Sequence, residues 1–384
     1  MIRVNNIHLS LDYDDKSVCK AVAQQLRIEE KSIKSCKIFR RSVDARKKDN
    51  IYFLTTVDAE LNINEEKVCK KCGNAQIARK YEYNQMKFGN APSPIVVGAG
   101  PAGLFATLIL ARSGANPILI ERGRDVDRRT ADVNRFWTSG KLDITSNVQF
   151  GEGGAGTFSD GKLNSGTKDI RQRKVLEEFV SHGAPDEILY NAKPHIGTDM
   201  LKGTIKNIRN EIIELGGRVM FETKLVSMAF SDNKLKSITV ETANGNEIIE
   251  TDNVILAIGH SARDTFEMLY DLKLPIEAKP FSIGARIEHL REKVDKAQYG
   301  RFAGNKKLGS ANYKLSTHLD NGRGVYTFCM CPGGKVVNAS SEENRLCTNG
   351  MSEFARDAEN SNSALLVGIN PDDYESDHPL AGMY

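Results

Sequence analysis

Runs of apolar residues in the middle of the chain predict a strand, a helix and a second strand in close succession. The first strand is expected at residues 95–97, just before a group of glycines, and an apolar helix is expected at 102–112. The second strand, at 118–120, ends at Glu121. This order is typical of a βαβ unit, whose strands lie parallel in one sheet.

A clear helical periodicity follows at residues 198–215. The apolar residues recur at alternating spacings of four and three, which places them on one face of a helix: Leu201, Ile205, Ile208, Ile212 and Leu215. Thr198 is expected to cap the start of this helix, and Gly216 to end it. We therefore predict an amphipathic helix that packs on the sheet and carries no chemistry.

Further strands are expected after this helix. We predict a strand at 218–222, a β-meander at 225–249 with a turn at Asn244-Gly245, and a buried strand at 253–258. The last strand runs into Gly259. A glycine at the carboxyl end of a parallel strand allows a ligand to lie against the backbone.

The flanking regions differ in pattern, so that three parts are expected. Residues 1–90 are predicted to be a small α+β module with its own core, residues 91–275 a Rossmann-type domain, and residues 276–384 a β-rich second domain. A linker is expected at 81–94. The strands and the helix expected in the flanking parts are strands 2–11, 37–39, 51–54 and 281–289, helix 18–26, and a strand pair at 324–337 with a Pro-Gly-Gly turn.

Composition narrows the class of protein only a little. The 384 residues are 40% hydrophobic and 27% charged, which is ordinary for a globular protein, and the net charge of +3 does not favour nucleic acid as the main partner. No stretch has the length of a membrane span, and the first residues lack the apolar core of a signal peptide. The seven scattered cysteines fit a reducing compartment, so a cytoplasmic location is expected.

The glycines after the first strand predict a dinucleotide site. Gly98, Gly100 and Gly103 have the G-x-G-x-x-G spacing, which gives a tight turn, close approach of a pyrophosphate and close packing of helix on strand. The phosphates would bind at the helix N-terminus. Glu121 is placed to accept hydrogen bonds from a ribose. Because a strand precedes these glycines, a helix follows them and an acidic residue ends the next strand, a dinucleotide site is favoured over a simple glycine-rich turn.

A second glycine-rich stretch, residues 149–165, is also expected to bind. The residues that suit a loop presenting N–H groups to phosphate or to a flavin edge are Gly151, Gly153, Gly154, Gly156, Thr157 and Ser159. The alternative is a flexible surface loop. The apolar residues Phe150, Phe158 and Leu163 within the stretch favour the binding loop.

Several other features have both a functional and a structural interpretation. The arginines of 122–135 either hold phosphate or lie on a solvated helix, and the basic residues of 34–48 are read as a solvated hairpin rather than a nucleic-acid surface. Cys69 and Cys72, like Cys329 and Cys331, are interpreted as structural rather than as metal or redox pairs. Arg286 and His289 are candidates for substrate contact, and His260, Arg286 and His289 are candidates for a general acid or base. The catalytic residues are not assigned, and no metal is expected.

Four stretches together resemble a known family: GAGPAG at 98–103 with Glu121, QFGEGGAGTFSDGKL at 149–163, AIGHSARDTF at 257–266 and FCMCPGG at 328–334. The chain is similar to the FAD-dependent dehydrogenases, also named NAD(P)/FAD-dependent oxidoreductases, within the glutathione-reductase-like flavoproteins. The resemblance implies FAD in a Rossmann-type domain with an inserted β-rich domain, and NAD(P)H as a candidate electron donor.

The resemblance also implies cofactor contacts for individual residues. The pyrophosphate would lie against Gly98, Ala99, Gly100, Pro101 and Ala102. Glu121 would hold the adenosine ribose, with Arg122 beside it. Leu225 would meet the adenine through its backbone, and Gly259 would lie near the dinucleotide.

One departure from the family pattern concerns the end of the chain. Such flavoproteins return late in the sequence to a Gly-Asp motif that contacts the flavin-side phosphate, and this sequence contains no Gly-Asp dipeptide. The family's chains continue beyond such a segment. The sequence is therefore expected to be a C-terminally truncated member with weakened FAD binding or none.

The function expected from these patterns is an FAD-dependent oxidoreductase that transfers hydride through flavin to or from a small-molecule substrate. Two other classes stay open. One is a non-catalytic dinucleotide- or nucleic-acid-binding protein, or an inactive fragment that lacks the segment closing the FAD site. The other is a dehydrogenase that uses NAD alone.

Overall fold

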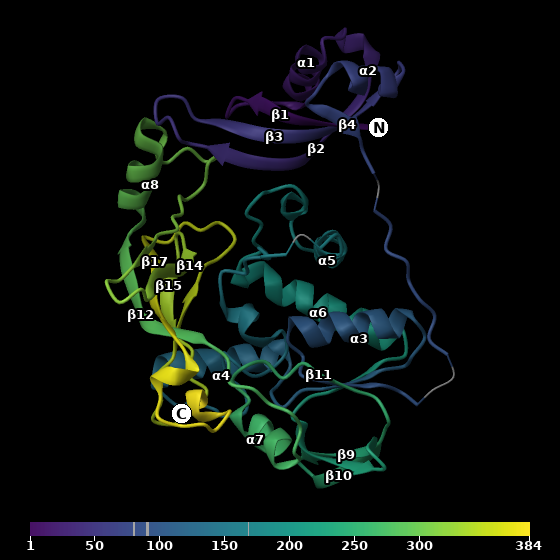
Figure 1. The fold of residues 1–384 in the computed structure, drawn as a ribbon, viewed down its shortest axis with the longest axis vertical. Helices are drawn as coiled ribbons and strands as arrows, with labels where there is room; N and C mark the ends of the chain where they lie inside the picture. Colours follow the sequence, from purple (N-terminus) through teal and green to yellow (C-terminus); the bar gives the residue numbers. More distant parts are fainter. Residues whose placement is uncertain (80, 90–91, 168) are drawn as a thin grey trace.

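The computed structural model describes residues 1–79, 81–89, 92–167 and 169–384. Figure 1 shows the N-terminal module at one end of the molecule, joined to the rest by a long extended segment along one side. The middle domain, which contains the predicted dinucleotide site, and the C-terminal sheet lie side by side beneath it. The fold class is α/β, as predicted, with a parallel sheet in the middle domain and antiparallel sheets on either side.

The middle domain is built on a parallel sheet with the order β11-β5-β6-β7. Its strands are short and apolar: β5 (Ile95–Val97), β6 (Ile118–Ile120), β7 (Arg218–Met220) and β11 (Val254–Leu256). Between β5 and β6 runs α3 (Pro101–Arg112). The predicted βαβ unit is confirmed. Its two strands are buried at every residue because helices cover one face and a further sheet covers the other.

The helix α6 (Thr198–Glu214) packs against α3 and closes one side of this domain. The predicted apolar face is confirmed, since Leu201, Ile205, Ile208 and Ile212 are all buried. The predicted cap is wrong. Gly197, with φ of +80°, occupies the N-cap position, while the hydroxyl of Thr198 donates a hydrogen bond to the carbonyl of Thr157 at 2.6 Å.

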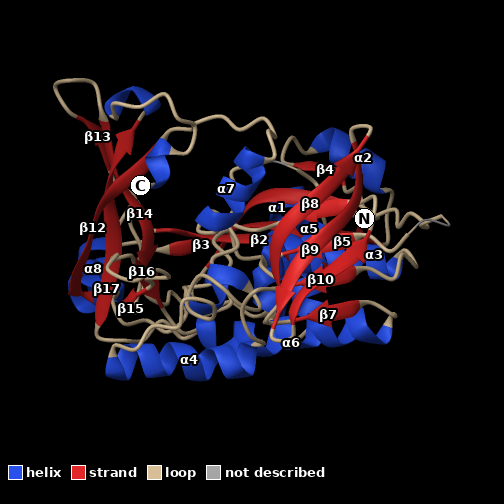
Figure 2. Cartoon of the chain, turned by 90° about the horizontal axis from the view of Figure 1, so that it is seen from below, coloured by secondary structure: helices blue, strands red, loops and turns tan. Residues whose placement is uncertain are grey.

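The meander of β8 (Lys224–Ser231), β9 (Lys234–Thr242) and β10 (Gly245–Glu250) is confirmed. Figure 2 shows it on one side of the molecule, with α4 (Val126–Ser139) running along the bottom towards the C-terminal sheet. The prediction that 253–258 is buried is wrong in part. Ile255 and Leu256 are exposed because β11 is an edge strand, and Leu256 lines a cavity.

The N-terminal module is an antiparallel sheet with two helices on it, in the order β2-β3-β1-β4. Its elements are β1 (Ile2–Leu9), α1 (Asp15–Leu26), β2 (Ile33–Asp44), β3 (Tyr52–Leu61), α2 (Glu65–Lys71) and β4 (Ala75–Ile77). The hydrophobic core of this module also contains side chains from another part of the chain. Val294, Tyr299, Leu308 and Met330 from the C-terminal region are buried in the same cluster as Val4 and Val57, so the module is packed onto that region.

The C-terminal region is organised around one antiparallel sheet, β12-β17-β14-β13. Its elements are β12 (Phe281–Leu290), α8 (Arg291–Tyr299), β13 (Ser316–His318), β14 (Gly324–Cys331), β15 (Lys335–Asn338), β16 (Thr348–Met351) and β17 (Asn360–Ile369). The predicted pairing across the Pro-Gly-Gly turn is wrong. β14 pairs with β17, and β15 pairs with β16, because the chain after the turn leaves the first sheet.

Two short helices complete the middle domain, α5 (Gln172–Ser181) and α7 (Arg263–Asp271). Within the described ranges, no helix has both the length and the apolar character needed to cross a membrane. Part of the expected linker, at residues 90 and 91, lies outside the described residues.

The packing of α6 gives a first test. Ile208→Ala should destabilise the middle domain by about 2–5 kcal/mol, because it removes a fully buried side chain and leaves a cavity. Ile213→Ala is the matched control on the same helix. Its side chain is 50% exposed, so a change within about 0.5 kcal/mol is expected. Urea denaturation followed by circular dichroism measures both, and equal shifts would contradict the packing described.

Candidate functional site

The two predicted glycine stretches meet backbone to backbone at the start of α3. The N–H of Gly153 donates to the carbonyl of Ala99 at 2.8 Å. A Cβ added to Gly154 would lie 2.9 Å from the Cα of Gly100, closer than real side chains come. A Cβ on Gly98, where φ is +101°, would lie 2.4 Å from the carbonyl oxygen of Ala257. Side chains are therefore excluded where the loops touch.

Glu121 ties the second loop to the first. Its carboxylate is buried and accepts three backbone hydrogen bonds, from the N–H groups of Ala99 (2.8 Å), Gly123 (2.9 Å) and Gly151 (3.0 Å). A carboxylate has about four acceptor positions, so this geometry leaves one for a ligand. The predicted ribose acceptor is thus also a structural residue that fixes both loops.

Arg129 of α4 holds the second loop from the other side. Its guanidinium is fully buried and donates hydrogen bonds to five carbonyl groups, those of Asn147 (2.8 Å), Val148 (3.0 Å), Gly151 (3.3 Å), Glu152 (2.6 Å) and Gly154 (2.9 Å). Burial lowers the pKa of Arg129 to about 10, although the negative charges of Glu121 and Glu152 act to raise it. It remains charged at neutral pH, and it fixes the path of residues 147–154.

A cavity of about 600 Å³ opens where the two loops, β6, β8 and β11 come together, and this volume is typical of a ligand site. The predicted site residues on its wall are Gly98, Gly100, Pro101, Ala102, Glu121, Arg122, Gly154, Gly156, Leu225 and Gly259. Four further predicted residues lie behind the wall: Ala99, Gly103, Gly153 and Thr157. They shape the loops, as at Gly103, where an added Cβ would lie 1.8 Å from the carbonyl oxygen of Gly98.

The N-terminus of α3 points its first turn at this cavity. Gly100 is the N-cap, Pro101 is the first helical residue, and no side chain of the described residues caps the turn. Because the first N–H groups of a helix lack partners within it, an uncapped N-terminus in a cavity wall favours an anion such as a phosphate.

Arg122 lies on the opposite wall and is engaged by the protein. Its guanidinium donates to Asp264 (2.8 Å) and Thr265 (2.9 Å), and it stacks on the ring of Phe150. Lys224 forms an ion pair with the same Asp264 at 2.7 Å. Burial acts to raise the pKa of Asp264, but the hydrogen bonds from Arg122 and Lys224 outweigh it and lower the pKa to about 2. The ion pair between Arg122 and Asp264 links the end of β6 to the start of α7 at the cavity.

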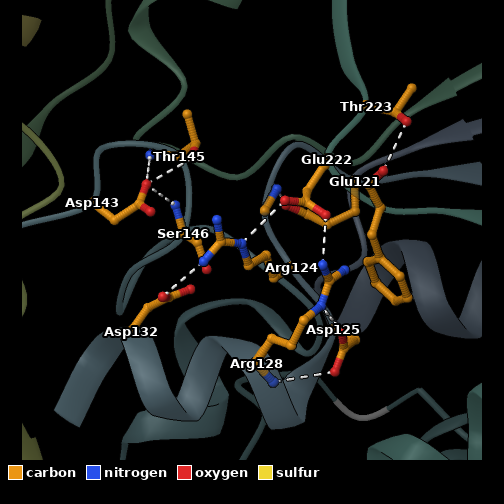
Figure 3. A network of polar contacts seen from close by, with 12 residues as sticks. Glu121, Arg124, Asp125, Arg128, Asp132, Asp143, Thr145, Ser146, Glu222 and Thr223 are labelled. Carbon is orange, nitrogen blue, oxygen red and sulfur yellow. Dashed lines mark hydrogen bonds and ion pairs between the residues drawn. The ribbon is translucent and has the colours of Figure 1, made fainter. Parts of the chain in front are cut away.

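The other arginines that follow Glu121 form an ion-pair network, shown in Figure 3. Arg124 contacts Asp132 (2.9 Å) and Glu222 (3.1 Å), and Arg128 contacts Asp125 (2.6 Å) and Glu222 (2.8 Å). Of the two interpretations made from the sequence, the solvated helix fits these residues better. Their charges are neutralised by carboxylates of the protein rather than left for a phosphate.

The remaining candidates lie apart from this cavity, with one exception. His260 lines it. Arg286 donates instead to Asn362 (2.7 Å), and the ring of His289 packs at a tilt against that of Tyr313. Cys69 and Cys72 lie at the end of α2, and the described residues contain no cluster of three potential metal ligands.

The sequence analysis missed two parts of the site. Arg129 was not distinguished from the half-buried Arg124 and the exposed Arg128, because sequence spacing alone does not separate a buried arginine from a solvated one. The apolar side of the cavity, formed by Leu256, Phe266 and Leu269, was also missed. The apolar residues at the end of a strand were a usable signal for it.

Comparisons with known proteins match the two flanking parts of the chain to family models and the whole chain to a relative. Residues 280–384 match the family model described as "FAD-dependent protein, C-terminal domain-like", and residues 1–60 match a domain of unknown function. An "Uncharacterized protein" of Clostridium beijerinckii is 48% identical over 388 residues, which cover 100% of this chain and 72% of the relative. The chain belongs to the family of that protein. The description of the C-terminal match supports FAD as the cofactor.

Solved flavoproteins show a more distant similarity. A flavoprotein/dehydrogenase from Cytophaga hutchinsonii is 14% identical and aligns over 74% of this chain and 58% of its own, with a TM-score of 0.34. The glycerol-3-phosphate dehydrogenase of Bacillus halodurans, solved with FAD, is 12% identical. It aligns over 75% of this chain and 49% of its own, also with a TM-score of 0.34. The chain spans about half the length of these two proteins. At these scores the similarity assigns neither arrangement nor activity.

The buried guanidinium gives a second test. Arg129→Met should lower the free energy of unfolding by about 3–5 kcal/mol, because five carbonyl groups lose their donor in a buried site. Arg135→Met, on the same helix, removes a side chain that is half exposed and should cost less than about 1 kcal/mol. Thermal denaturation followed by circular dichroism compares the two. A similar shift for both variants would show that the loop does not depend on Arg129.

Proposed function

We propose that this chain is an FAD-dependent oxidoreductase that binds its cofactor in the cavity between the two glycine loops. The observation that carries the proposal is the junction of these loops at the uncapped N-terminus of α3, with Glu121 at the end of the next strand. The C-terminal family match supports flavin rather than NAD as the resident dinucleotide.

The residues present fit a dinucleotide. Gly100 and Ala102 leave the helix N-terminus open to a pyrophosphate, with no side chain in the way. Glu121 retains one acceptor position for the hydroxyl of a ribose. Leu225, on β8, lies on the same wall and would meet the adenine through its backbone.

In the proposed reaction, bound FAD would supply hydride transfer, and the chain's own residues would bind and orient. The two glycine loops would hold the phosphates through backbone N–H groups. Leu256, Phe266 and Leu269 would exclude water from the apolar side of the cavity. We further propose a dehydrogenase reaction with NAD(P)H as electron donor, a small-molecule substrate rather than a nucleic acid, and a cytoplasmic location, which fits the seven free cysteines.

The first experiment is an absorbance spectrum of the purified chain, with any released cofactor identified by mass spectrometry. A flavin spectrum, or uptake of added FAD, is expected. A colourless protein that takes up no added FAD would overturn the proposal. Reduction of the bound flavin by NADH or NADPH under anaerobic conditions would then test the electron donor.

Gly100→Ala makes the binding test specific to the cavity. With φ of −72° and the nearest atom 3.9 Å from an added Cβ, the fold accommodates alanine, and the new methyl group would lie at the helix N-terminus where the pyrophosphate is proposed to bind. FAD affinity should fall at least about tenfold, equal to about 1.4 kcal/mol, with little change in the unfolding midpoint. The matched control is Gly203→Ala within α6, where an added Cβ meets nothing within 4 Å and FAD binding should be unchanged. Unchanged FAD affinity in Gly100→Ala would place the cofactor elsewhere.

A further inference from the structure

Two cysteines of β14, Cys329 and Cys331, lie next to a second, smaller cavity. Cys329 lines this cavity of about 280 Å³, and Cys331 is buried beneath it. The thiol of Cys331 turns back to donate a hydrogen bond to the carbonyl of Cys329 at 3.3 Å. Neither cysteine belongs to the cavity of the two glycine loops.

The backbone is distorted between these two residues in a way that suits a bond between them. Four residues of β14, Phe328 to Cys331, lie opposite only three of β17, Ala364 to Asn362, so β14 carries a bulge. Cys329 has φ of +45°, which is rare for a residue other than glycine. A flat strand would hold alternate Cα atoms about 7 Å apart, at the upper limit for a disulfide, whereas a bulge bends the strand.

A lysine from the second glycine loop reaches both sulfur atoms. The Nζ of Lys162 lies 3.6 Å from the Sγ of Cys331 and 3.9 Å from that of Cys329. Arg286 donates to the carbonyl of Cys329 at 3.3 Å. A hydrogen bond between the two side chains, the alternative to the one that Cys331 donates to the carbonyl, lowers the pKa of the Cys329 thiol and outweighs the effect of burial, and Lys162 and Arg286 lower this pKa further. The same side-chain hydrogen bond, together with burial, raises the pKa of the Cys331 thiol.

The cavity in front of Cys329 is cationic. Lys162, Lys193, Lys314 and Arg356 line it, and no carboxylate does within the described part of the chain. Asp160, behind the wall, forms ion pairs with Lys162 (2.9 Å) and Arg356, which leaves Lys193 and Lys314 to attract an anion. Lys193 and Arg356 also line a neighbouring cavity of about 500 Å³, which gives a larger anion room to enter.

We propose that Cys329 and Cys331 form a dithiol–disulfide couple that reacts with a small disulfide bearing carboxylate groups. Cys329 is the attacking residue because it faces the cavity, and Cys331 is the resolving residue because it lies behind. Lys162 stabilises the thiolate. The reaction needs no flavin, so it goes beyond the proposed function and is tested independently of it.

The steps balance as thiol–disulfide exchange. The Cys329 thiolate attacks one sulfur of the substrate R–S–S–R, so that its S–S bond breaks, a mixed disulfide forms on Cys329 and R–S⁻ leaves. Cys331 gives its proton to this leaving thiolate and attacks the Sγ of Cys329, and the second R–S⁻ leaves. One thiolate, one thiol and one substrate disulfide thus give the protein disulfide, one R–SH and one R–S⁻. The two cysteines are oxidised, and the substrate is reduced.

The experiment uses the full chain, reduced, freed of reductant and mixed with dithiobis(nitrobenzoate), which is a disulfide with two carboxylates. After the remaining thiols are alkylated, trypsin releases residues 324–335 as one peptide that contains both cysteines and no other. Mass spectrometry should find this peptide mainly unalkylated and lacking two hydrogens. Recovery with both cysteines alkylated, under conditions in which the exposed Cys347 has reacted, would overturn the proposal.

Variants assign the roles of the three residues. Cys331→Ser should stop at the mixed disulfide on Cys329, and Cys329→Ser should leave the peptide unreacted. Cys347→Ser, the matched control, should leave formation of the 329–331 disulfide unchanged. Lys162→Met should slow the reactions with the anionic reagent and with uncharged dithiodipyridine alike, by about tenfold, because the Cys329 thiolate loses its cationic partner, whereas Lys206→Met, a partly exposed lysine elsewhere, should change neither rate. Equal rates for Lys162→Met and the wild type would remove Lys162 from the site.

Discussion

The buried guanidinium of Arg129 is the interaction on which the candidate site depends. Residues 147–154 bury Val148 and Phe150, but their three glycines would leave the backbone free to move in the absence of partners. Arg129 supplies those partners by donating to five carbonyl groups of this segment. Burying a charge is costly unless its hydrogen bonds are satisfied. The loop satisfies them, and in return the loop has one fixed path.

Glu121 accepts hydrogen bonds from backbone N–H groups, as Arg129 donates them to backbone carbonyl groups. Gly151 is hydrogen-bonded to both residues. Its N–H donates to Glu121 at 3.0 Å, and its carbonyl accepts from Arg129 at 3.3 Å. A Cβ on Gly151 would lie 2.4 Å from the Cδ of Arg129, so only glycine fits between them. A buried anion and a buried cation thus hold the two faces of one peptide segment, and neither charge is left without a partner.

Much of the middle domain was predictable because its signals are local. Three consecutive apolar residues, a glycine spacing and an apolar face of period 3.6 each depend on neighbours in sequence, and the βαβ unit, the meander and α6 were correctly predicted from them. Strand pairing in the C-terminal sheet and the burial of Arg129 depend on residues far away in the chain, so the pattern around them carried no signal. The cap of α6 failed for the same reason, since Thr198 bonds to Thr157 instead.

The second glycine loop connects the two cavities. Gly154 and Gly156 lie on the wall of the larger one, and six residues beyond Gly156, Lys162 reaches the sulfur atoms of β14 in the smaller one. Asp160, buried between them, holds this part of the loop to Arg356. Arg129 thus fixes the loop at the larger cavity, and Asp160 fixes it next to the smaller one. Near the Arg129 end the path admits only glycine at Gly151, Gly153 and Gly154, because φ is positive there and an added Cβ would lie less than 3.0 Å from a neighbouring atom.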